Sequence, residues 1–243
     1  MSGHSKWSTI KRQKGANDAK RGLAFTKLSN AITMAVRQGG GVTDPNSNFR
    51  LRLAIDAARA VNMPKDTIDR AVQRAVGKNA NEMQEVVYEG FGPGGFSVII
   101  EAITDNKQRT TPEIKSIFDK NGGTMGVVGS VSYQFVQKGQ LIVKKADKTL
   151  DEIFLLAAEA GAEDVEDIGT EVIIYTTPET LHTVKSFLEE QHLSVDSAEI
   201  VNKPIVIKDL NDHEGQRAID FLEKLEEHND VQKVYANFAV QEA

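Results

Sequence analysis

The chain of 243 residues has room for two or three domains of ordinary size, and its 40% of hydrophobic residues is enough for packed cores. It contains no cysteine, which excludes disulfides, thiolate catalysis and zinc sites of the cysteine type. No apolar run approaches the roughly 18 to 20 residues of a membrane span, and no apolar core follows the basic N-terminus as in a secretory signal. We therefore expect a cytoplasmic protein without a membrane partner.

Charge is divided unevenly along the chain. Residues 1–80 contain 15 Lys and Arg against 5 Asp and Glu, a formal charge of +10. Residues 81–243 contain 14 against 30, a formal charge of −16, and the first glutamate is Glu82. The overall acidic balance thus hides a basic module joined to an acidic body. Such asymmetry favours nucleic-acid contact by the basic part, the alternative being a solvated surface that is rich in lysine.

The first 22 residues form a basic arm interrupted by glycines, with one aromatic side chain. Such an arm is poorly suited to a core and well suited to lie along a polyanion. Trp7 would either stack on bases or pack on the first helix. The residues expected to contact nucleic acid are Lys6, Trp7, Lys11, Arg12, Lys14, Lys20, Arg21 and Lys27.

Three short helices are expected to follow the arm. The first, capped by Asn17 or Asp18, runs to about Gln38 with an apolar seam at intervals of three and four residues, and Gly39 is the expected left-handed residue at its end. A second helix follows the turn at residues 43–46. Pro64 is expected at the first position of the third helix, which Gly77 ends. Residues 1–80 would form a small helical domain.

From residue 82 the pattern predicts strands around a glycine-rich loop. Gly90–Gly95 reads G-x-G-x-x-G, but a strand follows it, whereas a dinucleotide fingerprint must open a helix. We expect a shaped hairpin loop, whose glycines would let a partner surface come close. The expected loop contacts are Tyr88, Gly90, Gly92, Pro93 and Gly94.

The next segments predict a helix, a glycine loop and a strand. Thr110 and Glu113 fit a capping box, with Pro112 in the first turn of the helix. Gly126–Gly129 has the composition of a mobile loop, and alternating apolar residues predict a strand over 131–135.

The remaining elements predict an insertion. Residues 137–204 read β-α-β-β-α-β, the ferredoxin-like order. Residues 205–243 would supply the missing helix and last strand to residues 81–136. The expected fold class is α+β, with a small N-terminal helical domain followed by two ferredoxin-like α/β domains, the second inserted in the first.

Catalytic and metal-binding patterns are not found. The histidines His4, His182, His192, His213 and His228 lack a partner at ligand spacing, and no nucleophile elbow or phosphate-binding loop occurs. Acidic clusters around residues 163–167 and 223–227 read as solvated faces. We expect no cofactor, no metal and no enzymatic activity.

Several segments in one order resemble the signature segments of the YebC/PmpR family. They are Gly3–Trp7, Asp18–Gly22, Tyr88–Gly95, Asp105–Thr110 and Gly129–Val131. The resemblance covers essentially the whole chain. It implies three domains and a DNA-binding transcriptional regulator, with mitochondrial relatives that activate translation and bacterial members linked to ribosomes. Lys107 and Arg109, in the fourth segment, join the residues expected to bind nucleic acid.

Two functions stay open at this point. In the first, the protein is a transcriptional regulator that binds duplex DNA, although no recognition helix with helix-turn-helix spacing is obvious. In the second, it is a translation factor that binds ribosomal RNA on the ribosome, which suits a basic arm and recognition of shape and backbone. The oligomeric state is not predicted.

Overall fold

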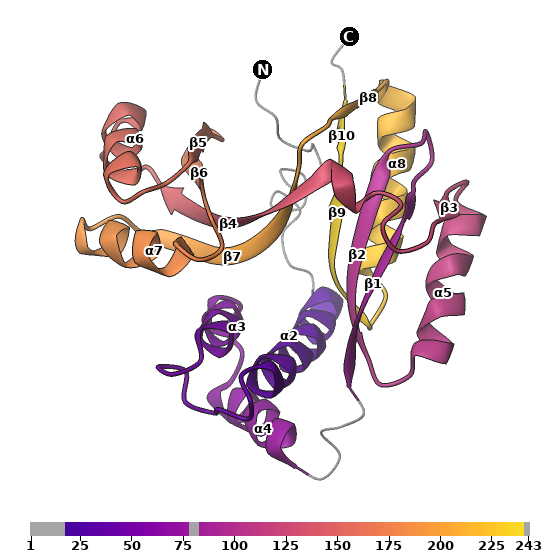
Figure 1. Ribbon diagram of the computed structural model, residues 1–243, viewed down its shortest axis with the longest axis horizontal. Coiled ribbons are helices and arrows are strands. Elements are labelled where there is room, and N and C mark those ends of the chain that lie inside the picture. The colour runs from indigo at the N-terminus through magenta and orange to yellow at the C-terminus, as the bar shows by residue number, and fades with distance from the viewer. Residues whose placement is uncertain (1–17, 78–82, 241–243) are drawn as a thin grey trace. The chain divides into compact units, whose positions relative to one another are not determined.

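The structure is a computed structural model that describes residues 18–77 and 83–240, with side chains from residue 22 onward (Figure 1). Residues 136–203 form one compact unit, and the other described residues form a second. The boundaries predicted from the sequence, 1–80, 81–136 with 205–243, and 137–204, stay a prediction, because the helical and middle parts fall within one unit.

The helical domain consists of α2 (Asp18–Gln38), α3 (Phe49–Ala60) and α4 (Lys65–Val76). Their apolar seams meet in one core, which includes Ile32, Val36, Leu51, Ile55, Ala58, Ile68 and Ala71. Asn48 caps α3 by accepting a hydrogen bond from the Leu51 amide at 3.1 Å, and its own amide donates to the Ala35 carbonyl at 2.9 Å. This side chain ties the start of α3 to the last turns of α2.

Two details of these helix ends differ from the expectation. The left-handed residues after α2 are Gly40 and Gly41, with φ of 69° and 84°, whereas Gly39 is needed for space, because a Cβ there would lie 2.2 Å from Asn48 Nδ2. Pro64 is the N-cap of α4 and not its first helical residue.

The middle domain is built on an antiparallel sheet with the strand order β3-β1-β2-β9. Its elements before the insertion are β1 (Gln84–Phe91), β2 (Ser97–Thr104), α5 (Lys107–Lys120), β3 (Thr124–Met125) and the 3₁₀ turn η2 (Ser132–Gln134). After the insertion come β8 (Lys208–Leu210), α8 (Asp212–Glu226), β9 (Val231–Ala236) and β10 (Phe238–Val240). The short strands β8 and β10 pair in parallel.

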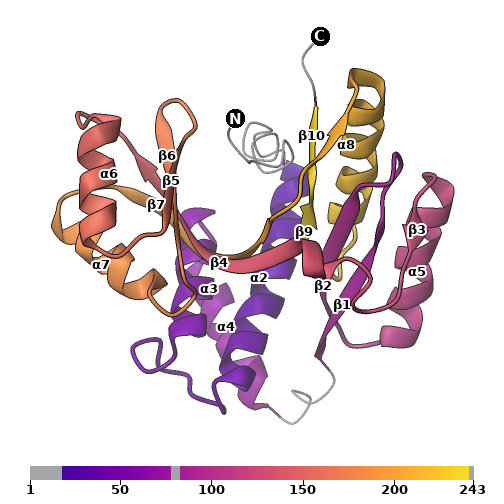
Figure 2. The same ribbon diagram turned by 45° about the horizontal axis from the view of Figure 1, so that its top comes forward.

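Helices α5 and α8 cover one face of this sheet (Figure 2). Alternate residues of the strands, among them Val98 and Ile100, meet Phe118 of α5 and Phe221 of α8 in the largest buried cluster. The two phenylalanine rings pack edge to face with centroids 5.1 Å apart. The segment after the insertion therefore completes a core begun by residues 83–135.

Two local predictions in the middle domain were wrong. Helix α5 begins at Lys107, because Asn106 caps it by accepting from the Arg109 amide at 3.1 Å. Thr110 lies inside the helix and bonds the Thr104 hydroxyl at 2.8 Å, so that no capping box forms with Glu113, and Pro112 lies in the helix interior. The expected strand over 131–135 is a 3₁₀ turn that leads into β4.

The inserted unit contains the elements β4 (Phe135–Lys144), α6 (Leu150–Glu159), β5 (Asp164–Asp167), β6 (Glu171–Thr176), α7 (Leu181–Glu190) and β7 (Val195–Pro204). The strand order β5-β6-β4-β7 with two helices is the ferredoxin-like arrangement. Thr149 begins α6 with a complete capping box. The predicted α+β fold class, with one α/β domain inserted in another, is confirmed.

Candidate nucleic-acid interface

The basic arm lies largely outside the described residues, which include none of Lys6, Trp7, Lys11, Arg12 and Lys14. Lys20 and Arg21 fall in α2, where only the backbone is described. Lys27 lies farther along α2, and its ammonium donates a hydrogen bond to the carbonyl oxygen of Glu226, the last residue of α8. A cation at the C-terminus of a helix is stabilised by the helix dipole, so Lys27 also joins the helical domain to α8.

Arginines of the helical domain donate mainly to neutral oxygens. Arg74 bonds the Asn30 side-chain oxygen at 2.8 Å and the Thr33 hydroxyl at 3.0 Å. Arg52 bonds the carbonyl oxygens of Pro45 and Asn46 at 3.0 and 2.9 Å, and Arg50 bonds the side-chain oxygen of Gln38. Neutral acceptors fix the guanidinium groups of Arg50 and Arg74 without cancelling their charge, whereas Arg52 also interacts with the Asp44 carboxylate. These arginines were not among the predicted contacts, although the lack of any glutamate before residue 82 is a signal for them.

Helix α5 presents Lys107 and Arg109 in its first turn, but their surroundings differ. The Arg109 guanidinium lies 2.8 Å from an Asp230 carboxylate oxygen and 3.1 Å from one of Asp105. The hydrogen bond and charge of Asp230 raise the pKa of Arg109 above its ordinary value. The charge of Arg109 is thus balanced within the protein.

Asp230 is the partner that determines this arrangement. Burial acts to raise the pKa of Asp230, but hydrogen bonds from the Thr110 hydroxyl, at 2.6 Å, and from Arg109 outweigh burial and hold the pKa below its ordinary value. The carboxylate is therefore charged at neutral pH and ties β9 to the start of α5.

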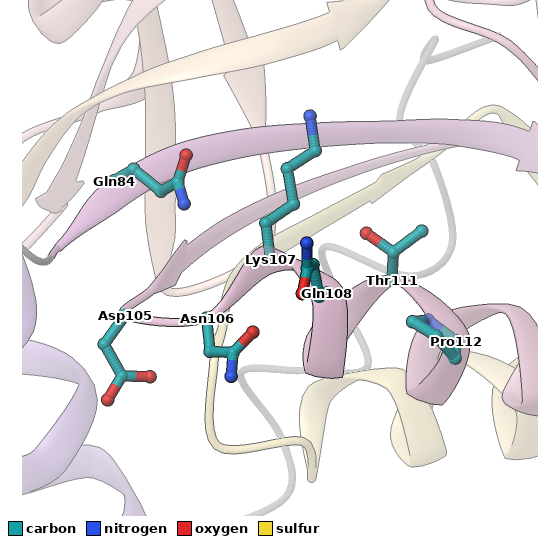
Figure 3. Close-up of a pocket in the computed structure, with 7 residues that line it drawn as sticks. All are labelled: Gln84, Asp105, Asn106, Lys107, Gln108, Thr111 and Pro112. Carbon is teal, nitrogen blue, oxygen red and sulfur yellow. The ribbon is translucent and has the colours of Figure 1, made fainter.

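Lys107 is exposed and lines an open depression of about 690 Å³. Figure 3 shows Lys107 rising from the first turn of α5, with Gln84 on one side and Thr111 on the other. The remaining lining residues are Asp105, Asn106, Gln108 and Pro112. The side-chain amides, the single lysine, the Asp105 carboxylate and the Thr111 hydroxyl together make a lining that can bind a polar surface.

The glycine-rich hairpin between β1 and β2 turns inward. Of the five expected loop contacts, Tyr88, Gly90, Gly92 and Pro93 are buried and Gly94, with φ of 90°, is exposed, as are Phe91 and Gly95 of the same hairpin. A Cβ at Gly90 would lie 2.5 Å from the carbonyl oxygen of Thr124, and one at Gly92 would lie 2.2 Å from the Phe96 ring. The close approach that these glycines permit is to the protein's own β3 and Phe96. Their contact with a partner stays a prediction.

Two buried polar residues were missed by sequence reasoning. Glu89, 3% exposed, and Asn237, 2% exposed, each bond the backbone of a loop segment. The signal for Glu89 is a carboxylate inside the apolar strand that precedes the hairpin. Its loop, Gly126–Gly129, is pinned by hydrogen bonds and does not have the open arrangement that its composition suggested.

The described residues, 18–77 and 83–240, include no cluster of three or more His, Asp or Glu able to hold a metal ion. Among the helices of the same ranges, none combines the length and the apolar character needed to span a bilayer.

Comparisons with known proteins cover the whole chain. Residues 5–78 match the model of the TACO1/YebC protein N-terminal domain, and residues 83–238 match that of the TACO1/YebC second and third domain. Relatives named "Probable transcriptional regulatory protein" include one of Acidithiobacillus ferrooxidans, 49% identical over 99% of this chain and 95% of its own. Another, of Desulfotalea psychrophila, is 48% identical over 100% of this chain and 97% of its own. The crystal structure of a conserved hypothetical protein from Aquifex aeolicus matches with a TM-score of 0.89 and 41% identity, over 98% of both chains.

Proposed function

Because the chain belongs to the TACO1/YebC family, we propose that it is a non-enzymatic, nucleic-acid-binding regulator of gene expression. Many relatives carry the name of probable transcriptional regulators, which supports the regulatory part of the proposal. In this proposal the basic N-terminal domain contacts phosphates, and the acidic remainder keeps nucleic acid from other faces.

The observation that carries the proposal is the charge of +10 in residues 1–80. Within the described part of that domain, Arg50 and Arg74 are held by neutral oxygens, so their charge is still available to phosphates. Lys107 is exposed and extends the contact to α5, whereas the carboxylates around Arg109 leave it little net charge to offer.

Reversal of charge in the arm tests this function. The triple substitution Lys11→Glu, Arg12→Glu and Lys14→Glu should weaken binding to a duplex or an RNA at least tenfold. It should also reduce the slope of log K against log salt by about 3, because each neutralised phosphate contributes about 1. The matched control reverses Lys115, Lys120 and Lys148 in the acidic remainder. Equal affinities and slopes for the two triple mutants would refute the proposal.

The second candidate is a translation factor that binds ribosomal RNA, and one feature of α4 favours it. The four-residue turn between α3 and α4 is short enough for a helix-turn-helix, but in the first half of α4 Asp66 and Asp69 offset the charges of Lys65 and Arg70. A recognition helix contacts base edges through its N-terminal residues, where these carboxylates would meet phosphates. Recognition of backbone and shape is therefore favoured over reading of a DNA sequence.

Salt-dependent binding separates the two candidates. A transcriptional regulator should prefer its promoter over unrelated duplex at physiological salt, whereas a translation factor should co-sediment with ribosomes and bind duplex weakly. Sequence preference on DNA without ribosome binding would eliminate the second candidate, and the reverse result would eliminate the first.

A further inference from the structure

Three basic side chains of the middle domain converge on a hollow of about 270 Å³. Lys120 comes from the last turn of α5, and Arg217 and Lys224 come from α8. The two helices lie side by side (Figure 1). The remaining lining residues are Asn121, Gly122 and Asp220. We call this hollow the basic pocket, and its lining of polar side chains and one glycine suits a polar or charged ligand.

The spacing of residues along α8 gives the basic pocket one of its walls. Positions i, i+3 and i+7 of an α-helix share one face, so Arg217, Asp220 and Lys224 form a single row. Phe221, beside this row, packs against Phe118 of α5 with ring centroids 5.1 Å apart. Packing of the two helices therefore brings cations from distant parts of the chain to the end of α5.

The end of α5 positions Lys224 and leaves room for Arg217. The Asn121 side-chain amide donates to the Ile117 carbonyl at 2.7 Å, which turns its oxygen to accept a hydrogen bond from the Lys224 ammonium at 2.6 Å. Gly122 has φ of 75°, and a Cβ there would lie 3.4 Å from Arg217 Nη2. The acceptor of Lys224 is neutral, so it fixes the ammonium without cancelling its charge.

None of these three cations forms an ion pair within residues 18–77 and 83–240. Acidic residues nevertheless outnumber basic ones by 30 to 14 in residues 81–243. In the inserted unit, for comparison, Lys138 and Lys145 each lie 2.6 Å from a carboxylate oxygen. An anion bound among the three unpaired cations would relieve their mutual repulsion.

The charge of the basic pocket matches that of a phosphate group. Its three cations and the Asp220 carboxylate leave a formal charge of +2. The C-terminus of α5 contributes about −0.5, so that about +1.5 remains. A phosphate group carries about −1.5 to −2 at pH 7. Arginine can hold two phosphate oxygens at once, and lysine adds a compact point charge.

The surroundings favour a small phosphorylated molecule over a nucleic acid. Asp119 and Glu223 directly precede Lys120 and Lys224 in the sequence, and Glu227 follows within one helical turn. A chain of phosphates would bring further negative charge against these carboxylates, whereas an isolated phosphate group occupies the pocket alone. Sites that enclose a whole small molecule have volumes of roughly 300 to 1,000 Å³, so this pocket holds one end of such a molecule.

We propose that the basic pocket binds the phosphate or diphosphate group of a small molecule. Arg217, Lys224 and Lys120 supply the donors and the charge, and Asn121 positions Lys224. The site is separate from the N-terminal arm, and the inference does not rest on the proposed function.

Nuclear magnetic resonance of the full-length, isotope-labelled protein, titrated with pyrophosphate at physiological salt, tests the proposal. The basic N-terminal domain also attracts pyrophosphate, so the readout must be specific for single residues. We expect saturable shifts of the backbone amides of residues 121–123 and of the Arg217 Nε–H at millimolar pyrophosphate. Absence of saturable shifts at these positions would overturn the proposal.

A pair of double variants isolates the pocket from general electrostatics. Arg217→Gln with Lys224→Gln should weaken binding at residues 121–123 at least about tenfold. The matched control, Lys115→Gln with Lys208→Gln, removes the same charge outside the pocket and should change binding less than about twofold. The four substituted side chains are exposed, so both variants should keep the wild-type unfolding temperature without ligand. Equal affinities of the two variants would refute the assignment.

A short single-stranded RNA, titrated in parallel, distinguishes the source of the phosphate. We expect it to leave the amides of residues 121–123 unchanged while pyrophosphate shifts them. If the RNA shifted the same amides and displaced pyrophosphate, the pocket would bind a nucleic-acid backbone, and the assignment to a small molecule would be wrong.

Discussion

Substitution Glu89→Gln removes a single charge from the middle of β1 and should destabilise the middle domain. Glutamine offers one acceptor oxygen and places an NH₂ group where the second carboxylate oxygen was. If the amide oxygen keeps the bonds from Val131 and Ser132, the NH₂ group faces the Gly129 amide, donor against donor. The substitution removes one hydrogen bond to a charged acceptor, which contributes about 1.5 to 3 kcal/mol to stability. It also leaves the Gly129 amide buried without a partner, at a cost of about 1 to 3 kcal/mol. After partial relaxation we expect a loss of about 3 kcal/mol in the free energy of unfolding.

The effect should depend on pH in a defined direction. Burial acts to raise the pKa of Glu89, but the amides of Gly129, Val131 and Ser132 outweigh burial and hold the pKa below 4.5. A carboxyl whose pKa is lowered by folding stabilises the protein above its unfolded pKa, and this contribution is lost as pH falls through the folded pKa. The difference in unfolding free energy between wild type and Glu89→Gln should therefore be constant from about pH 6 to 8 and shrink below about pH 4.5.

Urea unfolding followed by circular dichroism at several pH values measures this difference, and hydrogen exchange of residues 126–134 localises it. The matched control is Glu85→Gln, on the same strand and face but exposed, which should change stability by less than about 0.5 kcal/mol. If the two variants behaved alike, or if the Glu89→Gln difference did not change between pH 7 and pH 3, the assignment of Glu89 as the anchor of the loop would be wrong.

Three further predictions follow from local geometry. Gly90→Ala should destabilise the middle domain by about 1 to 3 kcal/mol through overpacking. Gly22→Ala, in an exposed position of α2 with open space around it, should stabilise the protein by about 0.5 to 1 kcal/mol. Thermal unfolding compares the two variants, and equal shifts in unfolding temperature would contradict the packing argument. Thr149→Ala should lower the free energy of unfolding of the inserted unit, measured in urea, by about 1 kcal/mol, whereas Thr149→Ser should keep it near the wild-type value. If the serine variant were as unstable as the alanine variant, the hydroxyl cap would not be responsible for the loss. Lys107→Ala should weaken nucleic-acid binding severalfold and flatten its salt dependence without a change in stability. Arg109→Ala should mainly lower the unfolding temperature, because it removes the ion pair with Asp230. Binding titrations and thermal unfolding measure both effects; if Arg109→Ala weakened binding and Lys107→Ala did not, Arg109 would be the phosphate contact.

Periodic patterns allowed most elements of this fold to be predicted from the sequence. The seam of α2 reflects burial of one face of the helix, and the continuous apolar run of β6 reflects burial of both faces of the strand; the sequence displays both patterns directly. The order of elements also indicated the insertion, because α8 and β9 had no other sheet to join.

The errors arose where tertiary contacts overrode a local motif. Thr110 and Glu113 match a capping box in sequence, but Thr110 is needed inside the helix to bond Thr104 and Asp230, and Asn106 takes the cap. Residues 131–135 alternate as a strand does, yet the Glu89 carboxylate binds two successive amides there, which imposes a turn.

The candidate site was predictable only in its gross charge. A count of lysine and arginine identifies the basic domain, but whether a given cation is available depends on its acceptors, which come from distant parts of the chain. Arg109 meets Asp230, a residue 121 positions away, and Arg74 meets Asn30, 44 positions away. No local pattern contains such pairs.

The insertion also has a consequence for how the chain is made. Strand β9 pairs with β2, and the partners Val98 and Ala236 are 138 positions apart in the sequence. One edge of β2 therefore stays unpaired until the intervening chain has been synthesised. Because β4 and β7 are neighbours in their own sheet, folding of the inserted unit brings its two ends to within about 5 Å, the spacing of adjacent strands. The long connection between β2 and β9 then behaves as a shorter loop, so the entropy cost of closing that loop when β9 pairs with β2 is reduced. During synthesis from the N- to the C-terminus, early folding of the inserted unit thus holds the two parts of the middle domain close together. A variant that delays this folding would leave nascent chains prone to aggregate.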